Sequence, residues 1–149
     1  MLTIVGMMRL VVVGILLLGS FGARAEAAPD VHVCMDGTSG IDDAERAAHV
    51  AQLRRTLAEA APEVKTIDVA VTKLSIVIGD DKVLVSAEVK VVVSTRDDQI
   101  KSFGVGTATF TVARRHYRPE RAGALRHQVL GDALDGVQRR RRAAYRRVA

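Results

Sequence analysis

The sequence predicts an α+β domain with the element order αβββα, a three-stranded antiparallel meander with both helices packed on one face. Residues 65–113 alternate between apolar and polar side chains in three segments, which two acidic turns separate. Residues 42–61 and 118–147 instead place apolar side chains three and four positions apart, as helices do. Helices on one face of an antiparallel sheet are the simplest layered arrangement of these elements, and 149 residues suffice for one domain.

The first 25 residues have the layout of a secretory signal peptide. Arg9 precedes an apolar core at residues 10–18, and the small residues Ala23 and Ala25 stand at positions −3 and −1 relative to Glu26. The alternative is an uncleaved anchor, but the core falls short of the roughly 18 apolar residues that cross a membrane. We therefore predict cleavage before Glu26 and a mature chain that is periplasmic or secreted.

The predicted organisation has four parts: a signal peptide at 1–25, an irregular lead-in at 26–40, a single αβββα domain at 41–138 and a basic C-terminal tail at 139–149. The charge is unevenly distributed along the mature chain. Residues 26–113 contain 9 basic and 14 acidic side chains, whereas the remaining residues contain 11 Arg and 3 acidic side chains. Such polarity indicates an acidic partner or surface, although a codon bias toward Arg is an alternative explanation.

The first helix is expected to begin at Asp42, which forms an acidic capping box with Glu45, and to end before Pro62. Its apolar stripe is rich in Ala, which favours close packing on a flat sheet. The stripe consists of Ala47, Val50, Leu53 or Arg54, Leu57 and Ala61.

The three strands are bounded by recognisable turn signals. The apolar parity changes between Val71 and Leu74, which predicts a β-bulge near Thr72 and Lys73. Residues 79–81 (Gly-Asp-Asp) and 96–98 (Arg-Asp-Asp) are typical of hairpin turns. Two glycines in the third strand, Gly104 and Gly106, predict a second kink.

His32 and Cys34 lie two residues apart on an extended segment, with Asp30 and Asp36 in phase. Imidazole and thiolate suit zinc or copper, so this tract is the best candidate metal site. Two strong ligands are too few, and we predict that no metal binds. A single cysteine excludes an intramolecular disulfide, and we expect Cys34 to be a buried thiol, with an intermolecular disulfide as the alternative.

No catalytic set stands out in the sequence. The four histidines, His32, His49, His116 and His127, have ordinary neighbours, and no Gly-x-Ser-x-Gly elbow is present. The Gly104–Gly106 fragment lacks the Lys of a phosphate loop. We therefore predict no enzyme activity and no cofactor, and keep a small enzyme of unknown class as the third alternative.

The strongest chemical feature is an Arg cluster in the second helix. Guanidinium groups bind phosphate and carboxylate in a two-pronged manner, so the cluster is a candidate anion contact. The equally weighted alternative is a solvated helix end, where cations oppose the helix dipole. Nucleic acid is electrostatically possible but an unlikely partner, because the chain is predicted to be exported and Tyr117 and Tyr145 are too few for base stacking. The cluster consists of Arg139, Arg140, Arg141, Arg142, Arg146 and Arg147.

Four stretches carry a resemblance to a known kind of domain: Val71-Thr-Lys-Leu74, Gly104-x-Gly-x-Ala-Thr-Phe-Thr-Val112, Arg118-Pro-Glu-Arg121 and Ala133-Leu-Asp-Gly-Val137. Through them, residues 64–138 resemble small exported bacterial domains with no settled activity, some of which stand beside HEAT-type helical repeats. The resemblance implies the βββα arrangement and an envelope setting. It implies no reaction and no site residue.

Together these observations predict an exported, non-enzymatic binding or assembly module of the bacterial cell envelope. Recognition is expected at the exposed face or the open edge of the sheet, through a protein partner or self-association. The alternative is a protein that binds an anionic surface, lipid or lipopolysaccharide, through the Arg-rich helix.

Overall fold

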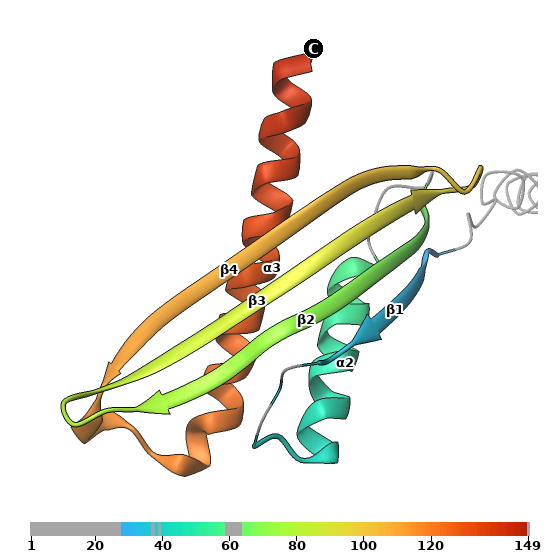
Figure 1. Ribbon diagram of the computed structural model, residues 1–149. Helices are drawn as coiled ribbons and strands as arrows, with labels where there is room; N and C mark the ends of the chain where they lie inside the picture. The colour runs from blue at the N-terminus through green and yellow to red at the C-terminus, as the bar shows by residue number, and fades with distance from the viewer. Residues whose placement is uncertain (1–27, 37, 39, 59–63, 149) are drawn as a thin grey trace, which may run out of the picture.

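The computed structural model describes residues 28–36, 38, 40–58 and 64–148, with side chains described as far as Arg140. The predicted signal peptide lies outside the described residues. The described elements follow one another along the chain as shown in Figure 1. They are β1 (Asp30–Cys34), α2 (Asp43–Leu57), β2 (Val64–Ile78), β3 (Lys82–Thr95), β4 (Ile100–Ala113), the short turns η1 (Arg114–His116) and η2 (Pro119–Arg121), and α3 (Ala122–Val148).

The sheet has four strands in the order β1-β2-β3-β4. The antiparallel meander of β2, β3 and β4 confirms the central prediction. The prediction of three strands was incomplete, because β1 pairs with β2 in parallel and makes the sheet mixed. The chain leaves β1, forms α2 and returns as β2, and such a crossover is the connection that parallel neighbours require.

The predicted irregularities of the strands are found at the expected turns and at the bulge. The β2–β3 pairing shifts register between Val71 and Lys73, and the Thr72 hydroxyl donates to the Glu88 carboxylate at 2.7 Å. In the first hairpin turn, the amide of Gly79 donates to the carbonyl oxygen of Lys82 at 2.9 Å. Asp98 in the second turn has a φ of 58°, a left-handed conformation that Asp tolerates better than most residues.

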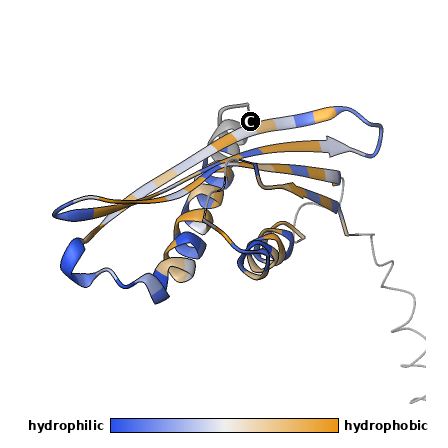
Figure 2. Cartoon of the chain, turned by 60° about the horizontal axis from the view of Figure 1, so that its bottom comes forward, coloured by the Kyte–Doolittle hydropathy of each residue, from blue (hydrophilic) through white to orange (hydrophobic). Residues whose placement is uncertain are grey.

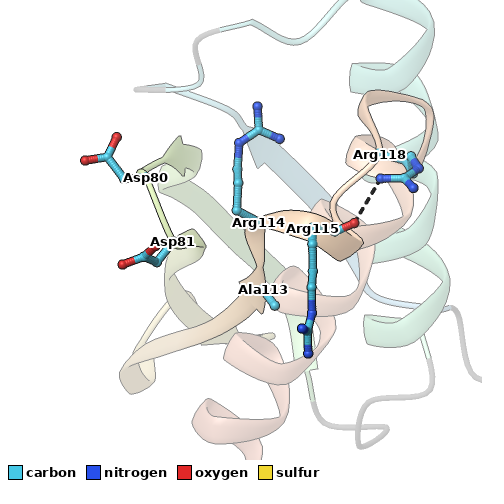
Figure 3. A pocket seen from close by; sticks show the side chains of 6 residues that line it. All are labelled: Asp80, Asp81, Ala113, Arg114, Arg115 and Arg118. Atoms are coloured by element: carbon cyan, nitrogen blue, oxygen red, sulfur yellow. Dashed lines mark hydrogen bonds between the residues drawn. The ribbon is translucent and has the colours of Figure 1, made fainter.

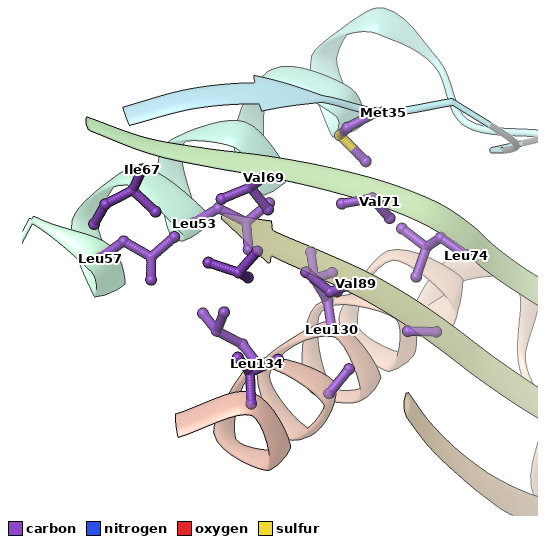
Figure 4. Close-up of a cluster of buried hydrophobic side chains, with 14 of the residues drawn as sticks. Met35, Leu53, Leu57, Ile67, Val69, Val71, Leu74, Val89, Leu130 and Leu134 are labelled. Atoms are coloured by element: carbon purple, nitrogen blue, oxygen red, sulfur yellow. The ribbon is translucent and has the colours of Figure 1, made fainter. Parts of the chain in front are cut away.

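Both helices cover the same face of the sheet, as predicted, and the core lies between them and the strands (Figure 4). In Figure 2 the hydrophobic sides of both helices face the strands. The buried side chains of α3 include Val129, Leu130, Ala133 and Val137. In α2 the buried side chains are His49, Leu53 and Leu57, whereas Ala47 is exposed. The predicted stripe was therefore wrong at its start, because the helix turns a polar residue, His49, toward the core.

The glycines of β4 lie where α3 crosses the strand, and the predicted kink does not take the form of a bulge. The β3–β4 pairing continues through Gly104 and Gly106 without a register shift. Instead, α3 crosses the strand at this point. A Cβ at Gly106 would overlap the carbonyl oxygen of Ala133, and one at Gly104 would lie 2.7 Å from Cγ1 of Val137. The glycines therefore permit a close approach of helix and strand.

Helix α3 is longer than the part that packs on the sheet. It has 27 residues, which corresponds to about 40 Å. After crossing β4 its C-terminal part projects past the edge of the sheet (Figure 1). In the part of the chain that the structure describes, we find no helix long and apolar enough to cross a membrane.

Candidate functional site

Strand β4 forms one edge of the sheet and is the candidate binding site. It is 14 residues long, whereas β1 at the other edge has 5 residues. Natural proteins protect edge strands by keeping them short or by placing proline or several charges on them. β4 contains no proline, and its single charged residue is Lys101. Apart from the place where α3 crosses β4 and Arg140 contacts Val105, the edge therefore has little of the usual protection against pairing with another strand.

The hydrogen bonds at the end of the sheet determine which backbone groups of β4 face outward. The amide of Arg114 donates to the carbonyl oxygen of Asp81 at 2.9 Å, so the even-numbered residues of β4 pair with β3. The odd-numbered residues then direct their N–H and C=O groups away from the sheet. In agreement, the outward carbonyl oxygen of Val105 accepts a hydrogen bond from Arg140 at 3.4 Å. The outward-facing residues are Phe103, Val105, Thr107, Thr109 and Thr111.

Side chains along this edge add apolar and hydroxyl groups to the exposed backbone. Ile100 and Phe103 are 71% and 62% exposed, and they are two of the four large apolar residues exposed in the described part of the chain. Thr107, Thr109 and Thr111 are also exposed. These features suit an extended ligand that needs both backbone pairing and a small apolar contact.

The structure places the Arg cluster next to this edge. Arg139 and Arg140 are exposed and follow Val137, the last buried residue of α3 over β4. The other four members, Arg141, Arg142, Arg146 and Arg147, lie on the same helix, and their side chains are outside the described part. The bond from Arg140 to Val105 thus joins two features that the sequence presented separately, the open strand edge and the cationic helix end.

A second feature, which the sequence did not indicate, is a charged hollow of about 670 Å³ at the opposite end of the sheet (Figure 3). Its lining comes from the β2–β3 turn and from the segment after β4. Arg118 donates to the carbonyl oxygens of Arg115 and Tyr117 at 3.1 and 3.0 Å, and so holds that segment in place. The side chains that line the hollow are two carboxylates, three guanidinium groups and one methyl group. Its lining residues are Asp80, Asp81, Ala113, Arg114, Arg115 and Arg118.

The sequence also missed a buried polar cluster between the helices. His49 is 2% exposed, and its Nε2 lies 3.1 Å from Oε1 of Glu45. Nη1 of Arg126 donates to both oxygens of the same carboxylate, at 3.0 and 3.1 Å. The cluster links α2 to α3. Because His49 is buried within it, a substrate cannot reach this side chain. The Glu45–His49 spacing of four residues was the available signal.

Cys34 is exposed, so the prediction of a buried thiol was wrong. The short β1 buries Val31 and turns the alternate residues outward, including His32 and Cys34. The thiol donates to Oδ2 of Asp36 at 3.0 Å, and this hydrogen bond, with lesser contributions from desolvation and the carboxylate charge, raises the pKa of Cys34. His32 contacts Asp30 at 3.3 Å. Among the described residues no group of three or more His, Cys, Asp or Glu side chains is arranged to hold a metal ion.

Comparison with known proteins gives structural likenesses of low similarity. No family model and no curated protein matches the chain, so the resemblance to domains beside HEAT-type repeats remains a prediction. A candidate lipoprotein from Caulobacter crescentus shares 12% identity with a TM-score of 0.41, over 74% of this chain and 82% of that one. A lipoprotein from Neisseria meningitidis shares 10% identity with a TM-score of 0.33, over 72% of this chain and 99% of that one.

Proposed function

We propose that this protein is an exported, non-enzymatic binding or assembly module of the bacterial cell envelope that takes an extended segment of a protein partner as a fifth strand on β4. The observation that carries the proposal is the 14-residue edge strand with its outward backbone groups. Strand addition uses such groups for affinity and the alternating side chains for specificity. Export is supported by the predicted signal peptide, and the non-enzymatic role by the lack of a recognised catalytic motif in the sequence.

Proline at an outward-facing position tests the proposal. Thr109→Pro removes an N–H that β3 does not use, so the sheet keeps its ladder while an incoming strand loses a donor. Thr109→Ala at the same position keeps the N–H and serves as the matched control. The measurement is capture of partner proteins from native envelope extract by the tagged mature chain, with the melting temperature of each variant recorded.

We expect the wild type and Thr109→Ala to capture the same partners and Thr109→Pro to lose them at an almost unchanged melting temperature. Equal capture by Thr109→Pro would show that the partner does not add to β4. Turnover of a substrate by the purified chain, abolished by one substitution in the charged hollow, would contradict the non-enzymatic role.

The second candidate function is binding to an anionic surface, lipid or lipopolysaccharide, and the observation that favours it is the projecting end of α3 with the exposed Arg139 and Arg140. The attraction between exposed opposite charges weakens as salt screens it. Sedimentation with vesicles containing phosphatidylglycerol is therefore expected to fall steeply with rising salt. Binding that does not change with salt concentration, or that persists after deletion of residues 139–149, would exclude this function.

A further inference from the structure

We infer that the segment added to β4 carries acidic side chains. The Arg side chains in the part of α3 that projects past β4 bind these acidic groups. This inference rests on the proposed strand addition and specifies the chemistry of the partner. Three observations carry it: the crossing of α3 over β4, the contact of Arg140 with the strand edge, and the charges that Arg139 and Arg140 leave unmatched.

The crossing fixes where the cationic end of the helix lies. Ala133 and Val137 pack on Gly106 and Gly104, where no side chain separates the helix from the strand. The helix then passes the edge, and Arg139 and Arg140 are the next exposed cations along it. A fifth strand would lie about 4.8 Å beyond β4, which is within reach of a side chain as long as Arg.

The contact of Arg140 with Val105 indicates what an incoming strand must replace. The guanidinium donates to an outward carbonyl oxygen that strand addition would take for itself. The incoming strand therefore frees the guanidinium beside its own side chains. A carboxylate there accepts the freed donors in a two-pronged, charge-assisted arrangement, which a neutral side chain does not provide.

No described carboxylate is paired with these cations, although the exposed Asp135 lies one helical turn before Arg139 in α3. Neither Arg139 nor Arg140 forms an ion pair with a described carboxylate. On the adjacent β3, Lys90 lies opposite Val105 on the face of the sheet away from the helices, and its Nζ lies 3.9 Å from Oε1 of Glu88. A second copy adding its own β4 would bring the same cations to the same edge, and like charges disfavour that arrangement.

Binding of two synthetic peptides to the mature chain tests the inference. Both contain the same alternating Thr and Val residues; one has a pair of Glu residues at each end and the other has Gln at those positions. The protein variants are the wild type, Arg139→Gln/Arg140→Gln and Thr109→Pro. Arg54→Gln/Arg55→Gln, which removes two exposed charges from α2, is the matched control.

We expect the acidic peptide to bind the wild type and the α2 control about tenfold more tightly than the Gln peptide at low salt. This ratio should fall to about one in about 0.5 M salt and in Arg139→Gln/Arg140→Gln, since the contact is exposed to solvent. Thr109→Pro should weaken both peptides.

The contrary outcomes separate this inference from the proposed function. Equal binding of the two peptides, lost in Thr109→Pro, would overturn the acidic preference and leave strand addition intact. Binding of the acidic peptide that is as tight in Thr109→Pro as in the wild type, or no binding of either peptide, would overturn both. Dimerisation of the free chain that Thr109→Pro abolishes would make a second copy the occupant and overturn the acidic segment.

Discussion

Gly106→Ala is expected to destabilise the domain strongly, because the added methyl group has no room. The Cβ would overlap the carbonyl oxygen of Ala133 and would lie 2.7 Å from Cγ2 of Val137. A carbonyl in a helix cannot rotate away, so α3 must move as a whole and lose part of its packing. Overpacking of a core commonly costs 1–3 kcal/mol, and we expect about 3 kcal/mol here. For a domain of this size that corresponds to a melting temperature lower by about 10 °C.

The same substitution at Gly136 is the control, and its expected effect has the opposite sign. A Cβ at Gly136, in the same helix, would meet nothing within 4 Å. Replacing a helical glycine by alanine there should stabilise by about 0.5–1 kcal/mol. Denaturant unfolding of the mature chain measures both variants. If Gly106→Ala is as stable as the wild type, α3 does not lie on β4 as described, and the position of the Arg side chains over the edge loses its support.

Three further predictions concern other parts of the molecule. Because Asp36 raises the pKa of Cys34, Asp36→Asn should lower that pKa and speed the reaction of the thiol with a disulfide reagent at neutral pH; an unchanged pH–rate profile would show that the hydrogen bond is not formed. Glu45→Gln leaves the mostly buried guanidinium of Arg126 without its counter-charge and should lower the free energy of unfolding by about 2–3 kcal/mol. In a double-mutant cycle, Glu45→Gln/Arg126→Met should lower the free energy of unfolding by less than the sum of the two single substitutions. Replacing residues 139–142 by Gln should leave the melting temperature within about 2 °C, and a large decrease would show that the cluster supports the fold.

The meander was predictable because its strands alternate cleanly and its turns contain the residues that turns require. Even the bulge at Val71 and Lys73 followed from a change of parity in the sequence. The pairing of β1 was not predictable in this way. A five-residue segment with this pattern is compatible with either a loop or a strand. The strand that it pairs with is determined by the path of the chain back through α2.

The candidate site was predictable only as separate parts. Strand β4 and the Arg cluster are both evident in the sequence, but the angle at which α3 crosses the sheet decides whether they meet. That angle depends on the two glycines of β4, which are equally consistent with a kink until the helix is seen above them. The burial of His49 was missed for a similar reason, since Glu45 and Arg126 come from different helices and only packing brings them together.

Amide hydrogen exchange of β4, with and without a saturating amount of the acidic peptide, tests the central claim most directly. The outward amides of Val105, Thr107 and Thr109 have no partner in β3, so they should exchange fast in the free chain and slowly in the complex. The inward amides of Gly106 and Ala108 already pair with β3 and should change little. Bound peptide that leaves the outward amides exchanging as fast as in the free chain would contradict strand addition at β4.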